Sequence, residues 1–109
     1  MSRFLITSRA IDLEAFRRGQ LDTSCGAYVQ FEGWVRDHNE GQAVLRLEYE
    51  VYEPLAVKEG EKIIAEAQEK FGISNAAAIH RSGLMELTEA AVVVGVSSPH
   101  GAEAFDACR

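Results

Sequence analysis

The sequence predicts a single α+β domain in which helices pack on a largely antiparallel sheet. Residues 27–36 and 43–52 alternate between apolar and polar side chains, which is the period of a strand. Residues 54–71 instead carry apolar side chains at helical spacing. The chain has 109 residues, 47% hydrophobic and 26% charged. This size and composition suit one domain, residues 1–109, with one core.

The N-terminal segment predicts a short strand followed by a helix. Residues 4–7 can form the strand, and Ser8 is the candidate N-cap of a helix that carries Ile11, Leu13 and Phe16.

The two alternating runs predict a long hairpin. Odd-numbered residues of 27–36, from Ala27 to Val35, share one face that we expect to be core. Residues 43–52 predict a second strand antiparallel to the first. The polar stretch "RDHNEG" between them is then the hairpin tip, and such loops often carry functional side chains.

The central helix is the best-defined element. Pro54 suits its first turn and Gly72 suits its C-terminal stop. Its predicted inward stripe consists of Ala56, Gly60, Ile63, Ile64, Ala67 and Phe71.

The C-terminal third predicts two strands and a helix. The strands are "AAAIHR" and "AVVVGVSS", separated by a connection over residues 83–90. Ser98 is the candidate N-cap of the last helix, with Pro99 in its first turn and Ala102, Phe105 and Cys108 facing inward.

Bulk properties exclude several classes of partner. With a net charge of −6 and a pI near 5.0, a broad attraction to nucleic acid or to anionic membranes is not expected. No apolar run has a membrane-spanning length, and the N-terminus lacks the pattern of a signal peptide, so we expect a cytoplasmic protein. Cys25 and Cys108 are expected to be reduced thiols, with a disulfide as the alternative. His38, His80 and His100 lack metal-ligand spacing, so no metal site is predicted.

Three stretches resemble the large, catalytic subunit of molybdopterin synthase. They are "GAYVQFEGWVRDHNEG", "IHRSG" and "VVVGVSSPHGAEAF", in this order and spacing. The resemblance implies an α/β hammerhead fold, a homodimer of the large subunit, and a heterotetramer with a small ubiquitin-like sulfur carrier ending in Gly-Gly. It also implies transfer of two thiocarboxylate sulfurs to a cyclic pyranopterin monophosphate, which forms the dithiolene of molybdopterin. Molybdenum is inserted later by other proteins, so no cofactor is expected here.

The resemblance also implies a substrate pocket. Phe31, Arg36 and His100 match pocket-lining positions of the family, and we include their neighbours Trp34 and Gly101 in the predicted binding set. A guanidinium such as that of Arg36 offers a planar fork for phosphate oxygens. His100 would lie in a first helical turn, beside free N–H groups, and could donate or transfer a proton.

Each of these assignments has a plain structural alternative. Arg36 could be a solvated strand end paired with Asp37 or Glu32, and His100 could be a solvated histidine near a helix end. His80 and Arg81 must point to opposite faces of a strand, so we expect one to be buried or at an interface and the other to be exposed. For both of these we favour a structural role.

Two departures from the family pattern affect the predicted chemistry. The family usually has an arginine where this chain has Gly101, which keeps a backbone N–H but supplies no charge. The family's catalytic lysines fall beyond Arg109, so we expect a truncated chain that is inactive alone, with its catalytic residues unknown. Lys58, Lys62 and Lys70 lie among glutamates on the central helix. The alternative function is a non-catalytic α+β ligand-binding or scaffold module.

Overall fold

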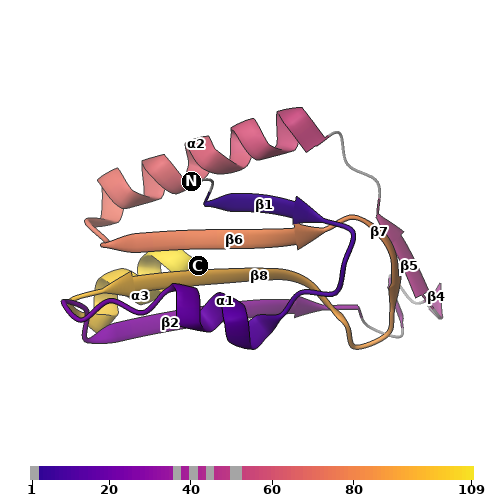
Figure 1. The fold of residues 1–109 in the computed structure, drawn as a ribbon, viewed down its shortest axis with the longest axis horizontal. Coiled ribbons are helices and arrows are strands. Elements are labelled where there is room, and N and C mark those ends of the chain that lie inside the picture. The colour runs from indigo at the N-terminus through magenta and orange to yellow at the C-terminus, as the bar shows by residue number, and fades with distance from the viewer. Residues whose placement is uncertain (1–2, 36–37, 40–41, 44–45, 50–52) are drawn as a thin grey trace.

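A computed structural model describes residues 3–35, 38–39, 42–43, 46–49 and 53–109, and its main feature is a four-stranded sheet (Figure 1). The strand order is β1-β6-β8-β2. β1 pairs with β6 in parallel, and β8 pairs with both β6 and β2 antiparallel. The predicted α+β class with a largely antiparallel sheet is confirmed. The strands are β1 (Phe4–Thr7), β2 (Ala27–Trp34), β6 (Asn75–Arg81) and β8 (Ala90–Ser98).

Helices cover both faces of this sheet. α2 (Glu53–Phe71) contacts β1 and β6, and α3 (Gly101–Cys108) contacts β8 and β2 on the same face. The core between them contains Ile64, Ile73, Ala76, Val96 and Ala104. α1 (Leu13–Gly19) lies on the other face, where the buried Phe16 ring covers Gly95.

The start of α1 differs from the prediction. Its N-cap is Asp12, whose Oδ1 accepts a hydrogen bond from the Ala15 N–H at 3.0 Å. The predicted Ser8 cap is therefore wrong. Both residue types favour N-caps, and here the residue that lies immediately before Leu13 takes the position.

α2 confirms the prediction at both ends. Pro54 lies in its first turn, and Gly72 follows its last residue at φ 64, a left-handed conformation that glycine adopts readily. Gly60 and Ile64 are buried as expected, and a side chain at Gly60 would collide with the Phe4 ring. Ile63 departs from the predicted stripe, since it is 61% exposed.

The start and inward face of α3 also differ from the prediction. Ser98 is the last residue of β8 and pairs with Ala27, so the helix begins later, with His100 as its N-cap. The inward face differs as well: Ala104 is buried and lies one turn before Cys108 on the same face, whereas Phe105 is exposed. Ala102 also faces outward, and of the predicted inward residues only Cys108 packs against the core.

The predicted long hairpin is only partly correct. β3 (His38–Asn39) pairs with β4 (Gln42–Ala43), so a hairpin tip does lie in this stretch. However, β2 pairs with β8 along its length, and β5 (Arg46–Tyr49) pairs with β7 (Gly83–Glu86). Alternation identifies a strand but not its partner. β7 lies in the predicted connection, and four residues are too few to show a period.

Candidate functional site

The predicted binding residues are spread along the β2–β8 ladder rather than gathered at one point. At one end Ala27 pairs with Ser98, and at the other Trp34 pairs with Ala90. We call these the helix end, which includes His100 and Gly101, and the hairpin end, which includes Trp34 and Val35. The eight residues of β2 span roughly 23 Å.

A row of polar side chains runs along one face of β2 to the hairpin end. The Trp34 indole N–H donates to Glu32 Oε1 at 2.9 Å, and the ring itself is 63% exposed. Gln30 donates to the other oxygen of Glu32 at 3.1 Å and accepts from the Tyr28 hydroxyl at 2.6 Å. Burial raises the pKa of Tyr28. Trp34 therefore presents an exposed ring whose polar atom is already bound.

The backbone of Val35 is held on both sides at the hairpin end. Its N–H donates to the Glu89 carbonyl at 3.0 Å, and its carbonyl accepts from the Thr88 N–H at 2.8 Å. Thr88 has φ 65, a left-handed conformation that is uncommon for threonine. Arg36 and Asp37 follow directly and lie outside the described residues. The structure thus fixes the position from which Arg36 leaves, while the predicted role of Arg36 stays a prediction.

Phe31 lies on the opposite face of β2 from Trp34. It lines a hollow of about 460 Å³ with Phe105 and Cys108 of α3. Burial raises the pKa of the Cys108 thiol, and a hydrogen bond with the Phe31 backbone opposes this. Ala27 and Val29 of the same face pack against the core, but Phe31 is 53% exposed. The predicted core face is therefore correct for Ala27, Val29 and the buried Val35, and wrong for Phe31.

At the helix end Ser98 is buried, but the start of α3 that follows it is open to solvent. His100 is exposed, and its side chain makes no capping hydrogen bond to α3. A Cβ added at Gly101 would meet nothing within 4 Å, whereas one at Gly26 would lie 3.1 Å from the Pro99 carbonyl oxygen. The backbone at Gly26 therefore lies close to Pro99, on the side of the turn away from Gly101. The side at Gly101 is free of neighbouring atoms. An anion could reach the first N–H groups of α3 there.

A short turn beside the helix end is held by Asp22. Its Oδ1 accepts from the Ser24 hydroxyl at 2.6 Å and from the Ser24 N–H at 2.9 Å, and its Oδ2 accepts from Asn75 at 3.0 Å. The Ser24 hydroxyl and then the Ser24 N–H are the main causes that lower the pKa of Asp22 below its ordinary value.

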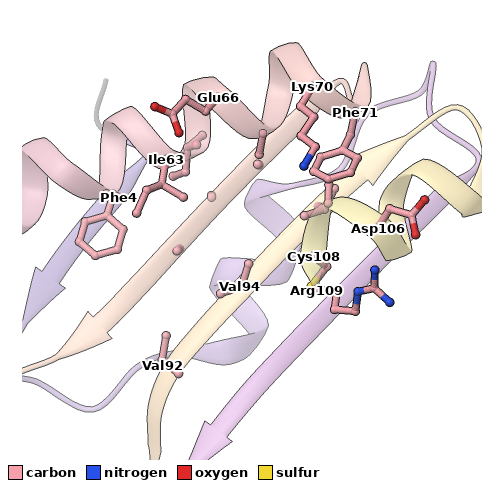
Figure 2. A pocket seen from close by; sticks show the side chains of 18 residues that line it. Phe4, Ile63, Glu66, Lys70, Phe71, Val92, Val94, Asp106, Cys108 and Arg109 are labelled. Atoms are coloured by element: carbon pink, nitrogen blue, oxygen red, sulfur yellow. The ribbon is translucent and has the colours of Figure 1, made fainter.

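A separate apolar groove lies between α2 and α3 (Figure 2). It has a volume of about 620 Å³, and none of the four predicted substrate residues that the structure describes, Phe31, Trp34, His100 and Gly101, lines it. Its walls are mainly apolar, with Glu66, Lys70, Asp106 and Arg109 as the charged side chains. Lys70 Nζ lies 5.2 Å from the centroid of the Phe71 ring. Such a surface suits an apolar group better than a phosphate.

The remaining titratable side chains form no further cluster in the part of the chain that is described. No group of three or more His, Cys, Asp or Glu side chains gathers there as a metal site would require. Cys25 and Cys108 are both free thiols, as predicted. None of the described helices is long and apolar enough to cross a membrane. All lysines of the sequence fall within α2, over the β1–β6 side of the sheet.

The sequence reasoning missed an ion pair that belongs to the hairpin end. Arg81 is only 6% exposed and pairs with the Glu89 carboxylate. The prediction for "IHR" is confirmed for Arg81, but His80 is half-buried rather than exposed, and its Nδ1 lies 2.7 Å from the Arg81 carbonyl oxygen. The available signal was an arginine at the end of an apolar strand, where a buried charge requires a partner.

Comparison with known proteins gives matches over nearly the whole chain. Residues 6–109 match the family model described as MoaE protein. The molybdopterin synthase catalytic subunit of Bacillus subtilis is 43% identical over 107 residues, which are 98% of this chain and 68% of the relative. The corresponding protein of Thermoplasma volcanium is 48% identical over 84 residues, 77% of this chain and 61% of the relative. This chain is thus shorter than both relatives.

Solved structures of other proteins share this fold. The crystal structure of molybdopterin synthase from Staphylococcus aureus superposes with a TM-score of 0.92 at 35% sequence identity. The superposition covers 99% of this chain and 79% of that one. The described arrangement of sheet and helices is therefore shared with that protein.

Proposed function

The chain belongs to the MoaE protein family, and on this premise we propose that it acts in molybdenum cofactor biosynthesis as the catalytic subunit of a molybdopterin synthase. The substrate is a cyclic pyranopterin monophosphate. A small ubiquitin-like subunit brings sulfur as a C-terminal thiocarboxylate, two sulfurs are transferred, and the cyclic phosphate opens to give the dithiolene product. The observation that carries the proposal is the match over residues 6–109 in sequence, together with the shared fold.

The distance between the two ends of β2 shapes the proposed site. Arg36 follows the hairpin end and His100 lies at the helix end, separated by a strand of roughly 23 Å. A single tricyclic substrate is too short to contact both ends of one chain. We therefore propose that two copies of the chain form a homodimer with two equivalent sites. Each site combines the hairpin end of one copy with the helix end of the other.

Each end has a distinct role in this proposal. Arg36 supplies the guanidinium fork for the phosphate, and the open first turn of α3 supplies backbone N–H groups beside His100. Opening of a cyclic phosphate, and attack and release at a thiocarboxylate carbonyl, both develop negative charge, which requires a positioned cation or general acid. The lysines belong to α2, which contacts β1 and β6, and Lys70 lines the apolar groove between α2 and α3. We propose that residues 1–109 bind substrate but turn it over slowly.

Subunit mixing tests the shared site. Arg36→Ala and His100→Ala chains should each bind the cyclic pterin phosphate weakly. After the two are unfolded and refolded together, about a quarter of the sites should bind normally, because half of the dimers are mixed and each contains one intact site. The matched control mixes wild type with the double variant. Its mixed dimers contain no intact site, so only the wild-type homodimers, a quarter of all dimers, should bind normally. No binding in the test mixture, with half of the sites intact in the control, would place the site within one chain.

A reconstituted assay tests the activity itself. Purified chain, thiocarboxylated small subunit and cyclic pterin phosphate are combined, and molybdopterin is measured. Slow formation that depends on the chain supports the synthase proposal. If the chain binds neither the pterin nor the small subunit, the alternative of a non-catalytic scaffold module is favoured. Turnover at the rate of a longer family member would show that no further cation is needed.

A further inference from the structure

We propose that Arg81 and Glu89 are positioning residues that fix where the segment with Arg36 leaves the sheet. Their ion pair holds the turn between β7 and β8, and that turn holds the backbone of Val35, the residue before Arg36. The part of this inference that concerns substrate rests on the proposed function. The part that concerns the anchoring of Val35 does not.

Arg81 connects two strands to the turn. It is the last residue of β6, lies opposite Thr7 of β1, and has a side chain that is 8% exposed. One guanidinium nitrogen pairs with the Glu89 carboxylate, and the other donates to the Ser8 carbonyl at 3.4 Å. The guanidinium therefore joins the end of β1 to the β7–β8 turn.

Glu89 acts on this turn through both its side chain and its backbone. Its Oε1 accepts from the Glu86 N–H at 3.3 Å, and its own N–H donates to the Glu86 carbonyl at 3.3 Å. Its carbonyl accepts from the Val35 N–H at 3.0 Å. The Glu89 carboxylate thus binds Arg81 and closes the β7–β8 turn, and the Glu89 backbone in that turn binds Val35.

Val35, which this turn holds, has both its backbone N–H and its carbonyl in hydrogen bonds. Val35 is 5% exposed, and its carbonyl accepts the Thr88 N–H at 2.8 Å. The ladder is irregular here, because Gly33 pairs with Val92 and Trp34 pairs with Ala90. A bulge of this kind redirects a strand, so the direction of the chain at Val35, the residue before Arg36, depends on how firmly the β7–β8 turn is held.

General energetics favour a positioning role over a purely stabilising one. A buried ion pair adds little net stability relative to well-packed apolar residues of similar volume. Its geometry is specific, however, because a guanidinium binds several acceptors in fixed directions. Here those acceptors belong to two separate segments, which an apolar pair would leave free to shift.

Amide hydrogen exchange tests the anchoring. In Arg81→Met, lower global stability accelerates exchange at all of these amides, and the Val35 and Thr88 amides should gain about tenfold more than the Val94 and Val96 amides of β8, since local opening adds to their exchange alone. Arg81→Lys keeps the charge without the planar fork and should give an intermediate increase. Arg17→Met is the matched control, since Arg17 forms an exposed ion pair with Glu14 on α1. Equal acceleration at all four amides would overturn the inference.

Coupling to Arg36 tests the effect on substrate. Arg81→Met should weaken binding of the cyclic pterin phosphate about tenfold, and the Arg36→Ala/Arg81→Met double variant should bind no more weakly than Arg36→Ala alone. Additive losses would show that Arg81 does not act through Arg36. Should Arg81→Met fail to fold, Glu89→Gln carries the same comparison. If wild type itself does not bind the pterin, the proposed function and the substrate part of the inference fall, while hydrogen exchange still decides the anchoring.

Discussion

The hairpin end and the helix end of β2 are built in opposite ways. At the hairpin end Val35 and Arg81 are 5% and 6% exposed, and a buried ion pair and two backbone hydrogen bonds hold the chain. At the helix end His100 is exposed, Gly101 has open space around it, and the polar contacts come from the exposed turn at Asp22.

This difference suggests that the two ends contribute to binding in different ways. A preorganised segment loses less conformational entropy when a ligand binds, so it can direct a charged side chain at little further cost. An open helix start can receive an anion without displacing protein groups. In the proposed homodimer each substrate would meet one end of each kind. Stability and binding should therefore respond differently to substitutions at the two ends.

The largest expected effect is on stability at the hairpin end. Arg81→Met leaves the Glu89 carboxylate without its partner and should lower the free energy of unfolding by about 3 kcal/mol, the lower part of the usual range because Glu89 is partly exposed. His100→Ala should change it by less than about 0.5 kcal/mol. Denaturant unfolding of the two variants measures the contrast. Equal losses would remove the proposed difference between the ends.

Arg36→Ala should separate binding from stability. If its guanidinium binds the substrate phosphate, the affinity for the cyclic pterin phosphate falls by about 1.5–3 kcal/mol, the scale of a charge-assisted hydrogen bond. The melting temperature should stay nearly unchanged. Calorimetry at fixed salt measures the affinity, with Arg18→Ala as a control for loss of an exposed charge on α1. An unchanged affinity would exclude Arg36 from the site.

Gly101→Arg should increase the affinity of the helix end for the substrate phosphate. An arginine there would add the charge that the family usually has, and the space around Gly101 accommodates a side chain. We expect an affinity gain of about 1 kcal/mol and no loss of stability. Titration with substrate at two salt concentrations checks this, with Gly101→Ala as the uncharged control. A gain in the alanine variant as well would attribute the effect to helix rigidity rather than charge.

The smallest expected effect concerns pH and Asp22. Hydrogen bonds lower its pKa in the folded state, so the carboxylate adds stability that is present above the unfolded pKa and is lost as pH falls through the folded value. Below about pH 4, wild type should lose slightly more stability than Asp22→Asn, which does not titrate. Thermal melts between pH 3 and 6 compare the two. Parallel curves would show that Asp22 makes no contribution.

The sequence predicted the elements with the clearest local signals. α2 begins with Pro54 and ends before Gly72 as expected, because φ preferences and an apolar stripe act within a few residues. The alternating run starting at Ala27 was recognised as a strand for the same reason. N-caps were less certain, since Ser8 and Asp12, or Ser98 and His100, compete for one position and the surrounding fold selects between them.

By itself the sequence determined the fold class, the family resemblance and the residue types available for binding. Only the tertiary structure decided that β2 pairs with β8, that Arg81 is buried against Glu89, and that Trp34 and His100 lie at opposite ends of one ladder. Alternation and helical spacing are properties of neighbouring residues. Strand partners and buried ion pairs join residues far apart in the chain, and they depend on packing that no local pattern encodes.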